Sequence, residues 1–375
     1  MDKLVTNILE TEHVAGLAAG LVTRDRAVWS KGYGWADIEQ RIPMSTDTIM
    51  NVASVSKTIT ATAVMQLCER GDIGLDADIN EYLPFEVWNP RYPKARITVR
   101  NLLTHRSSIK DGPAYGDSYV CGDPTINLWQ WIRRYLVPGG EYYDPQENFY
   151  AWEPGHDGEL APESGSYTNV GFGLLGYLVE AVSGMSFEGY CRRHIFDPLG
   201  MACTGWSLAS IDQTRHAIPY TYVPPLDSGE SDEHDFNLAR FPLAERPIER
   251  ESYFAHCLYS FPNFPDGGLR TTINDLGKFL RATIGQGALA GARILQQATV
   301  RDMLSPVLPG RGLCWSTRES DDGSVMWFHA GMDPGVVALM ALWPSEEIGV
   351  VTFANSHAPA QSMMSVVQRL CSMVS

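Results

Sequence analysis

Apolar residues at the two ends of the chain follow the spacing of helices and strands. Residues 1–13 have the i, i+3, i+4 spacing of an amphipathic helix. Residues 15–23 and 26–34 resemble two strands joined by a tight turn at Arg24 and Asp25. Near the C-terminus, Val336–Trp343 and 349–354 are apolar runs of strand length. The last segment returns to helical spacing, with Met363, Val366, Val367, Leu370, Cys371 and Val374.

The middle of the chain has a different pattern. A helical run begins near Thr58 and ends at Gly71, 97–104 is a short helix, and Val170–Ser183 is a long one. Residues 111–165 are irregular and rich in aromatic side chains, which is typical of a functional region or an insertion. The acidic stretch 227–235 is predicted to be a solvated loop.

This order of elements predicts an α+β fold with a discontinuous architecture. The terminal strands are expected to join one antiparallel sheet, flanked by the N- and C-terminal helices. We therefore assign residues 1–52 with 255–375 to an α/β lobe and 53–254 to a mainly helical lobe. The cleft between the lobes is the expected active site.

Composition narrows the functional classes. Hydrophobic residues make up 44% of the 375 residues and charged residues 19%, as in a globular protein. The formal net charge of −15 argues against nucleic acid and against an anionic membrane as partners. No apolar run reaches 18 residues, so no transmembrane helix is expected.

The seven cysteines are scattered and include no CxxC pair, so no zinc site is predicted. Such thiols suit a reducing compartment. The first segment also lacks the continuous apolar core of a signal peptide. A cytoplasmic protein without metal or other cofactor is the resulting expectation.

The sequence Ser54-Val-Ser-Lys57 opens the first long helix of the middle region. Residues three apart on a helix share one face, so Lys57 can reach the Ser54 hydroxyl. The helix N-terminus favours a developing negative charge, and burial can make the lysine a base. A second copy, Ser107-Ser-Ile-Lys110, follows a short helix and is assigned to a loop.

Two further motifs could complete a site. Tyr167-Thr-Asn169 precedes the long helix, where a tyrosine beside a lysine can relay protons and Asn169 can bind a carbonyl. By itself the motif is better explained as a helix N-terminal turn with a packed tyrosine. His329-Ala-Gly331 precedes the strand near residue 336, where a small residue permits close approach, although a hairpin glycine is the alternative.

Other motifs are set aside. Gly171-Phe-Gly-Leu-Leu-Gly176 matches the dinucleotide fingerprint by letter, but no strand precedes it, so its glycines are assigned to close helix packing. His156-Asp-Gly158 has no following strand. The absence of P-loop, HExxH and GxSxG motifs removes the NTPase, zincin and α/β-hydrolase classes.

The order S-x-x-K, Y-x-N and H-x-G resembles the serine β-lactamase and penicillin-binding-protein superfamily. In detail it is similar to the class C β-lactamase branch, with its family VIII carboxylesterase and lovastatin-type acyltransferase relatives. The resemblance extends over nearly the whole chain. It includes Gly32-Tyr-Gly, Thr46-Asp-Thr, Ala53-Ser-Val-Ser-Lys, Leu102-Leu-Thr-His-Arg-Ser, Gly173 to Gly184, Pro198-Leu-Gly-Met, Gly267 to Asp275 and Val350 to Asn355.

The resemblance implies a class C β-lactamase-like fold and a role for each motif residue. Ser54 becomes the acylated nucleophile, and Lys57 and Tyr167 share proton transfer, with the base unassigned. Asn169 holds Lys57 and the substrate. The backbone N–H groups of Ser54 and Met332 form the oxyanion hole, with Gly331 beside them.

Two departures from the family pattern bear on the substrate and the fold. His329 stands where β-lactamases carry the lysine of K-T-G, which weakens the case for β-lactam recognition. Ser108 replaces a glycine that is usual in the family.

A carboxylesterase acting on small or medium neutral esters is the leading interpretation. The alternatives are an acyltransferase using the same acyl-enzyme, a D-peptidase or β-lactamase, and a scaffold without activity. The partner is then a small-molecule ester or acyl substrate, and the oligomeric state is left open. We also expect Tyr115, Tyr119, Trp129 and Trp152 either to wall the substrate pocket or to pack the loop against the helical lobe.

Overall fold

A computed structural model describes residues 1–156, 166–224, 251–319 and 323–374 of the chain. The acidic stretch 227–235, predicted to be a loop, lies outside the described residues.

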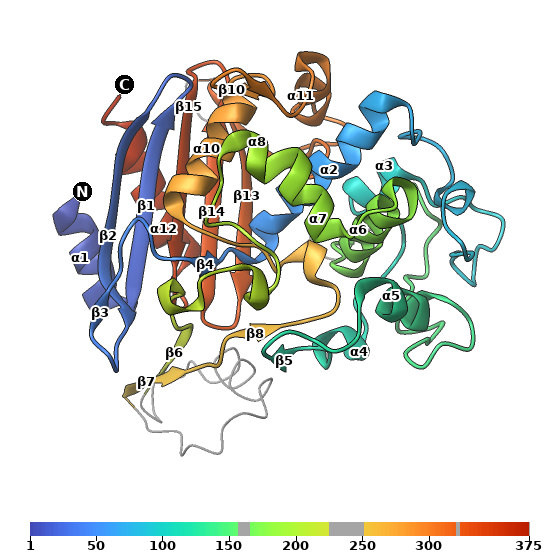
Figure 1. The fold of residues 1–375 in the computed structure, drawn as a ribbon, viewed down its shortest axis with the longest axis horizontal. Helices are drawn as coiled ribbons and strands as arrows, with labels where there is room; N and C mark the ends of the chain where they lie inside the picture. The colour runs from blue at the N-terminus through green and yellow to red at the C-terminus, as the bar shows by residue number, and fades with distance from the viewer. Residues whose placement is uncertain (157–165, 225–250, 320–322, 375) are drawn as a thin grey trace.

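One antiparallel sheet of seven strands dominates one side of the molecule (Figure 1). The strand order is β12-β13-β14-β15-β1-β2-β3, so strands from the two ends of the chain lie side by side at β15 and β1. All seven fall within residues 1–52 and 255–375. Their bounds are β1 Gly16–Thr23, β2 Ala27–Asp37, β3 Ile42–Pro43, β12 Ser316–Glu319, β13 Val325–Asp333, β14 Val336–Trp343 and β15 Ile348–Ala354.

The central strands are covered on both faces, which explains their continuous apolar sequences. On one face Leu17 and Leu339 pack with α1 (Asp2–Thr11) and α12 (Ala360–Cys371). On the other face Ala18 and Met340 pack with α10 (Ile273–Ile284). Alternate residues of one strand therefore enter two different cores.

The rest of the chain forms a mainly helical region, to the right in Figure 1. Its helices are α2 Ser56–Arg70, α3 Val99–Leu103, α4 Pro113–Gly116, α5 Leu128–Leu136, α6 Val170–Ser183, α7 Phe187–Cys191 and α8 Asp197–Leu199. Helix α11 Gln297–Met303 lies near the top of the view, to the right of β10. Two-stranded ladders are β4 Met50–Asn51 with β9 Arg270–Thr271, β5 Val120–Cys121 with β8 Tyr259–Ser260, β6 Tyr220–Val223 with β7 Ser252–Ala255, and β10 Ala288–Leu289 with β11 Ala292–Arg293.

The elements predicted from periodicity are present, including α6 and β14 at the predicted bounds. Several elements were missed, among them helices α5 and α10 and strands β12 and β13. Helix α5 lies in the region assigned as irregular and buries a face of Leu128, Trp131, Ile132, Tyr135 and Leu136. Strands β12 and β13 also lack a clear apolar run, and β13 contains His329 and Gly331, which the sequence placed before a strand.

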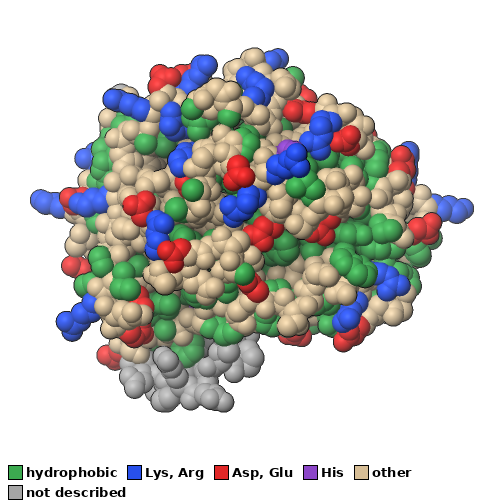
Figure 2. All heavy atoms as spheres, viewed as in Figure 1, with side chains coloured by type: hydrophobic (Ala, Val, Ile, Leu, Met, Phe, Trp, Pro, Cys, Tyr) green, Lys and Arg blue, Asp and Glu red, His purple; other side chains and the backbone are tan. Residues whose placement is uncertain are grey.

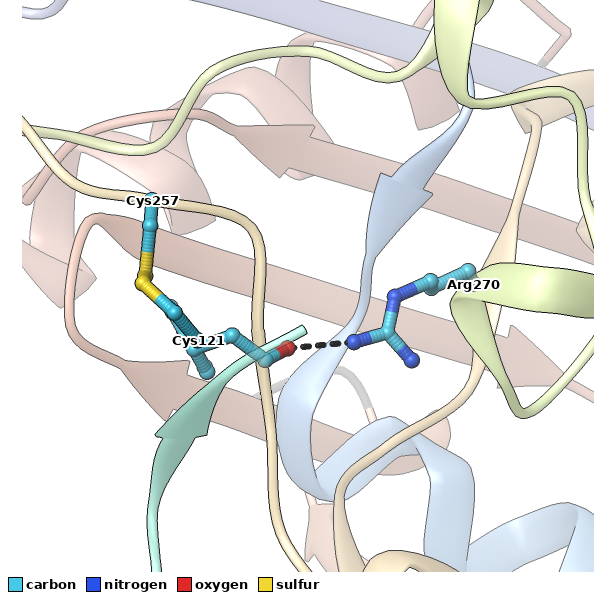
Figure 3. The surroundings of a disulfide bond; sticks show 4 residues. Cys121, Cys257 and Arg270 are labelled. Carbon is cyan, nitrogen blue, oxygen red and sulfur yellow. Dashed lines mark hydrogen bonds between the residues drawn. A yellow bond between two sulfur atoms is a disulfide. The ribbon is translucent and has the colours of Figure 1, made fainter. Parts of the chain in front are cut away.

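A disulfide joins Cys121 to Cys257 (Figure 3). It lies where β5 pairs with β8, close to the buried guanidinium of Arg270 in the same view. The interpretation of all seven cysteines as separate thiols is therefore wrong for this pair. Within the described part of the chain, the other five cysteines form no disulfide: Cys68, Cys191, Cys203, Cys314 and Cys371.

Acidic and basic side chains are interspersed over the face seen in Figure 2, among tan and green patches. Among the described residues, no single helix is both long and apolar enough to span a bilayer. Two helices with a sharp bend between them, Val170–Ser183 and Phe187–Leu199, are together long and apolar enough.

Candidate active site

Ser54 lies on a 3₁₀ turn, η1 (Ala53–Val55), that leads directly into α2. The preceding residue, Ala53, has φ of +45°, a conformation that side-chain-bearing residues rarely adopt. The Asn51 carboxamide accepts the Ala53 N–H at 2.6 Å and fixes this turn. Such local strain is typical of a functional position, since surrounding contacts must maintain it.

The Lys57 side chain is fully buried below Ser54 and donates three hydrogen bonds. Its Nζ lies 2.9 Å from Ser54 Oγ, 2.7 Å from Asn169 Oδ1 and 2.8 Å from the backbone oxygen of Asp266. An ammonium has three donors and no acceptor, so Lys57 can donate to each of these three oxygen atoms. The three oxygen atoms around Nζ favour the protonated form of Lys57.

Burial alone lowers the pKa of Lys57, but the negative groups around it outweigh burial and raise the pKa overall. These groups are Tyr167, Asp266 and Asp111. For Tyr167, burial raises the pKa, and the charge and hydrogen bond of Lys57 oppose that rise. Lys57 and Tyr167 therefore titrate as a coupled pair that holds its protons.

Tyr167 is positioned by stacking as well as by Lys57. Its ring centroid lies 4.9 Å from Lys57 Nζ and 4.1 Å from that of His105, with 26° between the two ring planes. His105 Nδ1 accepts the backbone N–H of Thr168 at 3.2 Å, which places its proton on Nε2. His105 belongs to the Leu102-Leu-Thr-His-Arg-Ser segment, but sequence reasoning gave it no role.

Asp111 holds the start of α6, and sequence reasoning missed it too. Its carboxylate accepts backbone N–H groups of Asn169 and Val170, each at 2.9 Å, and the Thr168 hydroxyl at 3.2 Å. It acts as a helix cap from 58 residues away, where no local capping pattern could reveal it.

The glycines of the Gly171–Gly176 segment allow close packing, as predicted. A Cβ on Gly173 would collide with the Asn263 carboxamide, next to the turn η6 (Phe264–Asp266). Asn263 uses this position to donate to the Asn169 backbone oxygen at 3.0 Å. Gly173 thus lets α6 pack closely against the segment of Asn263 and η6, which also contacts Lys57 through Asp266.

Strand β13 forms the opposite wall. A Cβ on Gly331 would meet the Val52 carbonyl and would lie 3.0 Å from the Ser54 nitrogen, so only glycine lets the strand contact the nucleophile turn. The turn, rather than a substrate, is what approaches Gly331. The next residue, Met332, is 63% exposed.

His329 is 6% exposed, and its Nδ1 donates to the Ala330 carbonyl at 2.8 Å. Its other nitrogen, Nε2, is then an acceptor. Burial, reinforced by the nearby Lys57 charge, lowers the pKa of His329 to about 3. The imidazole is therefore neutral at physiological pH.

These walls enclose a cleft of about 720 Å³. Six of the seven predicted site residues line it, namely Ser54, Tyr167, Asn169, His329, Gly331 and Met332, with Lys57 beneath. The cleft continues along an apolar side between the sheet and α12, formed by Val337, Leu339, Met363 and Met364.

None of the four aromatic residues proposed as pocket walls lines this cleft. Trp129 is 43% exposed on α5, and Trp152 stacks on Tyr150. Tyr115 is buried against Trp131 and Phe261. The alternative, that these side chains pack the loop against the helical region, holds for Tyr115.

Two arginines not singled out from the sequence, Arg311 and Arg318, also line the cleft. The Arg311 guanidinium donates to the Thr104 carbonyl at 3.3 Å and is close enough to lower the pKa of His329 further. They were missed because neither belongs to a motif. Across the described ranges, no group of three or more His, Cys, Asp or Glu side chains is arranged to hold a metal ion.

A family model described as Beta-lactamase matches residues 1–367 of the chain. Protein flp of Staphylococcus aureus is 22% identical over 361 residues, which are 96% of this chain and 63% of that protein. The chain thus spans less than two thirds of flp.

Solved structures share the fold. The D-amino acid amidase from Ochrobactrum anthropi complexed with L-phenylalanine has a TM-score of 0.75 and 20% identity, covering 100% of both chains. A class C β-lactamase from Rhodobacter sphaeroides has a TM-score of 0.67 and 19% identity, covering 100% of this chain and 98% of that one. The expected class C β-lactamase-like fold is confirmed.

Proposed function

Because the chain belongs to the β-lactamase family, we propose that it is a serine hydrolase that forms an acyl-enzyme on Ser54 and acts on small or medium neutral esters. The observation that carries the proposal is the 2.9 Å contact between buried Lys57 and the Ser54 hydroxyl. Nucleophile and proton-transfer group are within direct reach, which covalent catalysis requires.

In the proposed reaction, the Lys57–Tyr167 pair first loses one proton to solvent; Ser54 Oγ then attacks the ester carbonyl carbon, and the serine proton moves to the pair. The backbone N–H groups of Ser54 and Met332 stabilise the oxyanion. The carbon–oxygen bond to the leaving alcohol breaks, and the pair returns the proton to that alcohol. Water then attacks the acyl-Ser54 ester by the same steps and releases the acid.

The neutral His329 supports an uncharged substrate. β-Lactams and cell-wall D-peptides carry a carboxylate near the scissile bond, and a lysine supplies a lasting positive charge for it. With Nδ1 already donating to Ala330, His329 presents an acceptor instead. An acceptor nitrogen repels a carboxylate, and it can accept a hydrogen bond from the hydroxyl of the leaving alcohol.

The test compares kcat/KM for a neutral p-nitrophenyl butyrate with that for a penicillin. We expect clear ester turnover and little penicillin turnover, and His329→Lys should raise the relative rate on a chromogenic cephalosporin. A penicillin preferred tenfold or more in the wild type would overturn the ester assignment and leave the family membership untouched.

A second candidate is a hydrolase for carboxylate-bearing substrates, favoured by the two arginines in the cleft. Arginine binds carboxylates in a bidentate manner and stays charged at all physiological pH values. Arg311→Gln separates the two candidates. It should lower kcat/KM for a carboxylated D-peptide ester, but not for the neutral ester, if this second candidate is correct.

A further inference from the structure

A buried carboxyl group that takes no part in the steps above lies beside Lys57. The turn η6 ends at Asp266, whose backbone oxygen accepts the third Lys57 hydrogen bond at 2.8 Å. Asp266 is 1% exposed. A carboxyl group is costly to bury, so this position calls for a physical explanation.

Neighbouring polar groups hold the carboxyl group of Asp266. Asn263 Nδ2 donates to its Oδ2 at 2.7 Å, and the Tyr115 hydroxyl forms a second hydrogen bond. The same Asn263 amide contacts the Asn169 backbone oxygen at 3.0 Å. Asp266 is thus joined both to the lysine and to the segment that carries Tyr167.

The charge of Asp266 acts on both members of the proton-transfer pair. A negative carboxylate at this place raises the pKa of Lys57 and also that of Tyr167. Burial raises the pKa of Asp266 itself to about 7, against the opposing effects of Lys57, Asn263 and Tyr115. The group therefore changes charge near neutral pH.

Other charged or titratable groups around the pair come from every element packed against it. They are Asp111 before α4, Tyr115 on α4, His105 after α3, Cys314 before β12, His329 on β13, and Arg311 in the cleft. Of these, Asp111 accepts hydrogen bonds from the backbone at the start of α6. The two histidines are neutral because burial lowers the pKa of each.

We propose that Asp266 is a positioning residue whose carboxylate charge holds the protons on the Lys57–Tyr167 pair and so sets the pH at which Ser54 is acylated. The proposal rests on the proposed acyl-enzyme function. It assigns to the side chain a role separate from that of its backbone oxygen, which any residue could supply.

Asp266→Asn tests this role with an isosteric side chain that keeps an acceptor for Asn263. The readout is the rate at which a fluorophosphonate modifies Ser54, followed by intact mass from pH 5 to 10. In this step an Oγ–P bond forms, the P–F bond breaks with loss of fluoride, and the serine proton passes to the pair. No knowledge of the natural substrate is needed.

The rise of this rate with pH should move to lower pH in Asp266→Asn, because the pair loses a neighbouring negative charge. A slower rate with an unmoved profile would mean a merely structural role and would overturn the proposal. No modification of Ser54 in the wild type at any pH would instead refute the proposed function.

Tyr115→Phe provides a second, milder variant. Removing its hydrogen bond raises the pKa of Asp266, so the carboxyl stays neutral over a wider range. A smaller shift in the same direction is expected near neutral pH. Tyr190→Phe, which removes a buried hydroxyl that accepts a hydrogen bond from Arg70, is the matched control and should leave the profile unmoved.

Discussion

The chain contains the same four-residue motif twice, and the two copies adopt different structures. At Ser54–Lys57 the residues follow a helical turn, and the lysine lies 2.9 Å from the serine hydroxyl. At Ser107–Lys110 the lysine points away and pairs with Glu147 at 3.0 Å. The buried Ser107 hydroxyl accepts the Ile109 N–H at 3.3 Å instead.

The two copies differ in the backbone conformation of the residues between the serine and the lysine. Ser108 has φ of +61°, which interrupts any helix and turns Lys110 outward. This conformation also explains why the related family uses glycine at that position. The S-x-x-K motif therefore indicates a catalytic serine only when its four residues lie on one helical turn.

The largest expected difference in kcat comes from replacing the serine of each motif copy. Ser54→Ala should lower kcat by roughly 10⁶-fold, the size of effect seen on removing a nucleophile. Ser107→Ala should leave kcat unchanged. Intact-mass analysis after fluorophosphonate treatment should show one label on wild type and none on Ser54→Ala. A label on the peptide carrying Ser107 would reverse the assignment.

Loss of the tyrosine that only the first copy contacts should have the next largest effect. Tyr167→Phe should lower kcat by roughly 10² to 10⁴, the range for a general acid–base group. Because the pair holds its protons, the wild-type acylation rate should be higher at pH 9 than at pH 7. Tyr177→Phe, on α6 but packed against Phe85, is the control and should keep both rate and profile. Retention of most activity in Tyr167→Phe would exclude the proton relay.

The smallest effect is expected at the second lysine. Lys110→Met removes a partly exposed ion pair with Glu147, so the free energy of unfolding in urea should change by about 1 kcal/mol or less. Ester turnover should persist. The matched Lys57→Met should fold yet lose turnover. An equal loss of turnover in both would show that the two copies are not functionally distinct.

The sequence predicted the fold where periodicity was strong. Buried strands such as β14 and the helix α6 have unbroken apolar patterns, and the terminal helices bury one clear face. Helix α5 was missed because its aromatic residues masked a regular spacing. Strand β13 was missed because it has no continuous apolar run and carries a histidine and a glycine.

The residues of the candidate site were likewise predicted only in part. Ser54, Lys57, Tyr167 and His329 belong to short motifs, and the structure brings them to one cleft. Asp111, Asp266 and Arg311 belong to no motif, and the family segment that contains His105 suggested no role for it. The roles of all four depend on contacts between segments far apart in sequence. Only the folded chain shows, for example, that a carboxylate caps a helix 58 residues away.

The Cys121–Cys257 disulfide closes the chain between these residues into a covalent ring, with a sequence separation of 136. The ring contains Tyr167 and Asn169, whereas Ser54 and His329 lie on its two tails. A single cut anywhere inside the ring would therefore release no fragment until the disulfide is reduced. The two halves of the site would remain parts of one molecule after such a cut, although the backbone between them was broken.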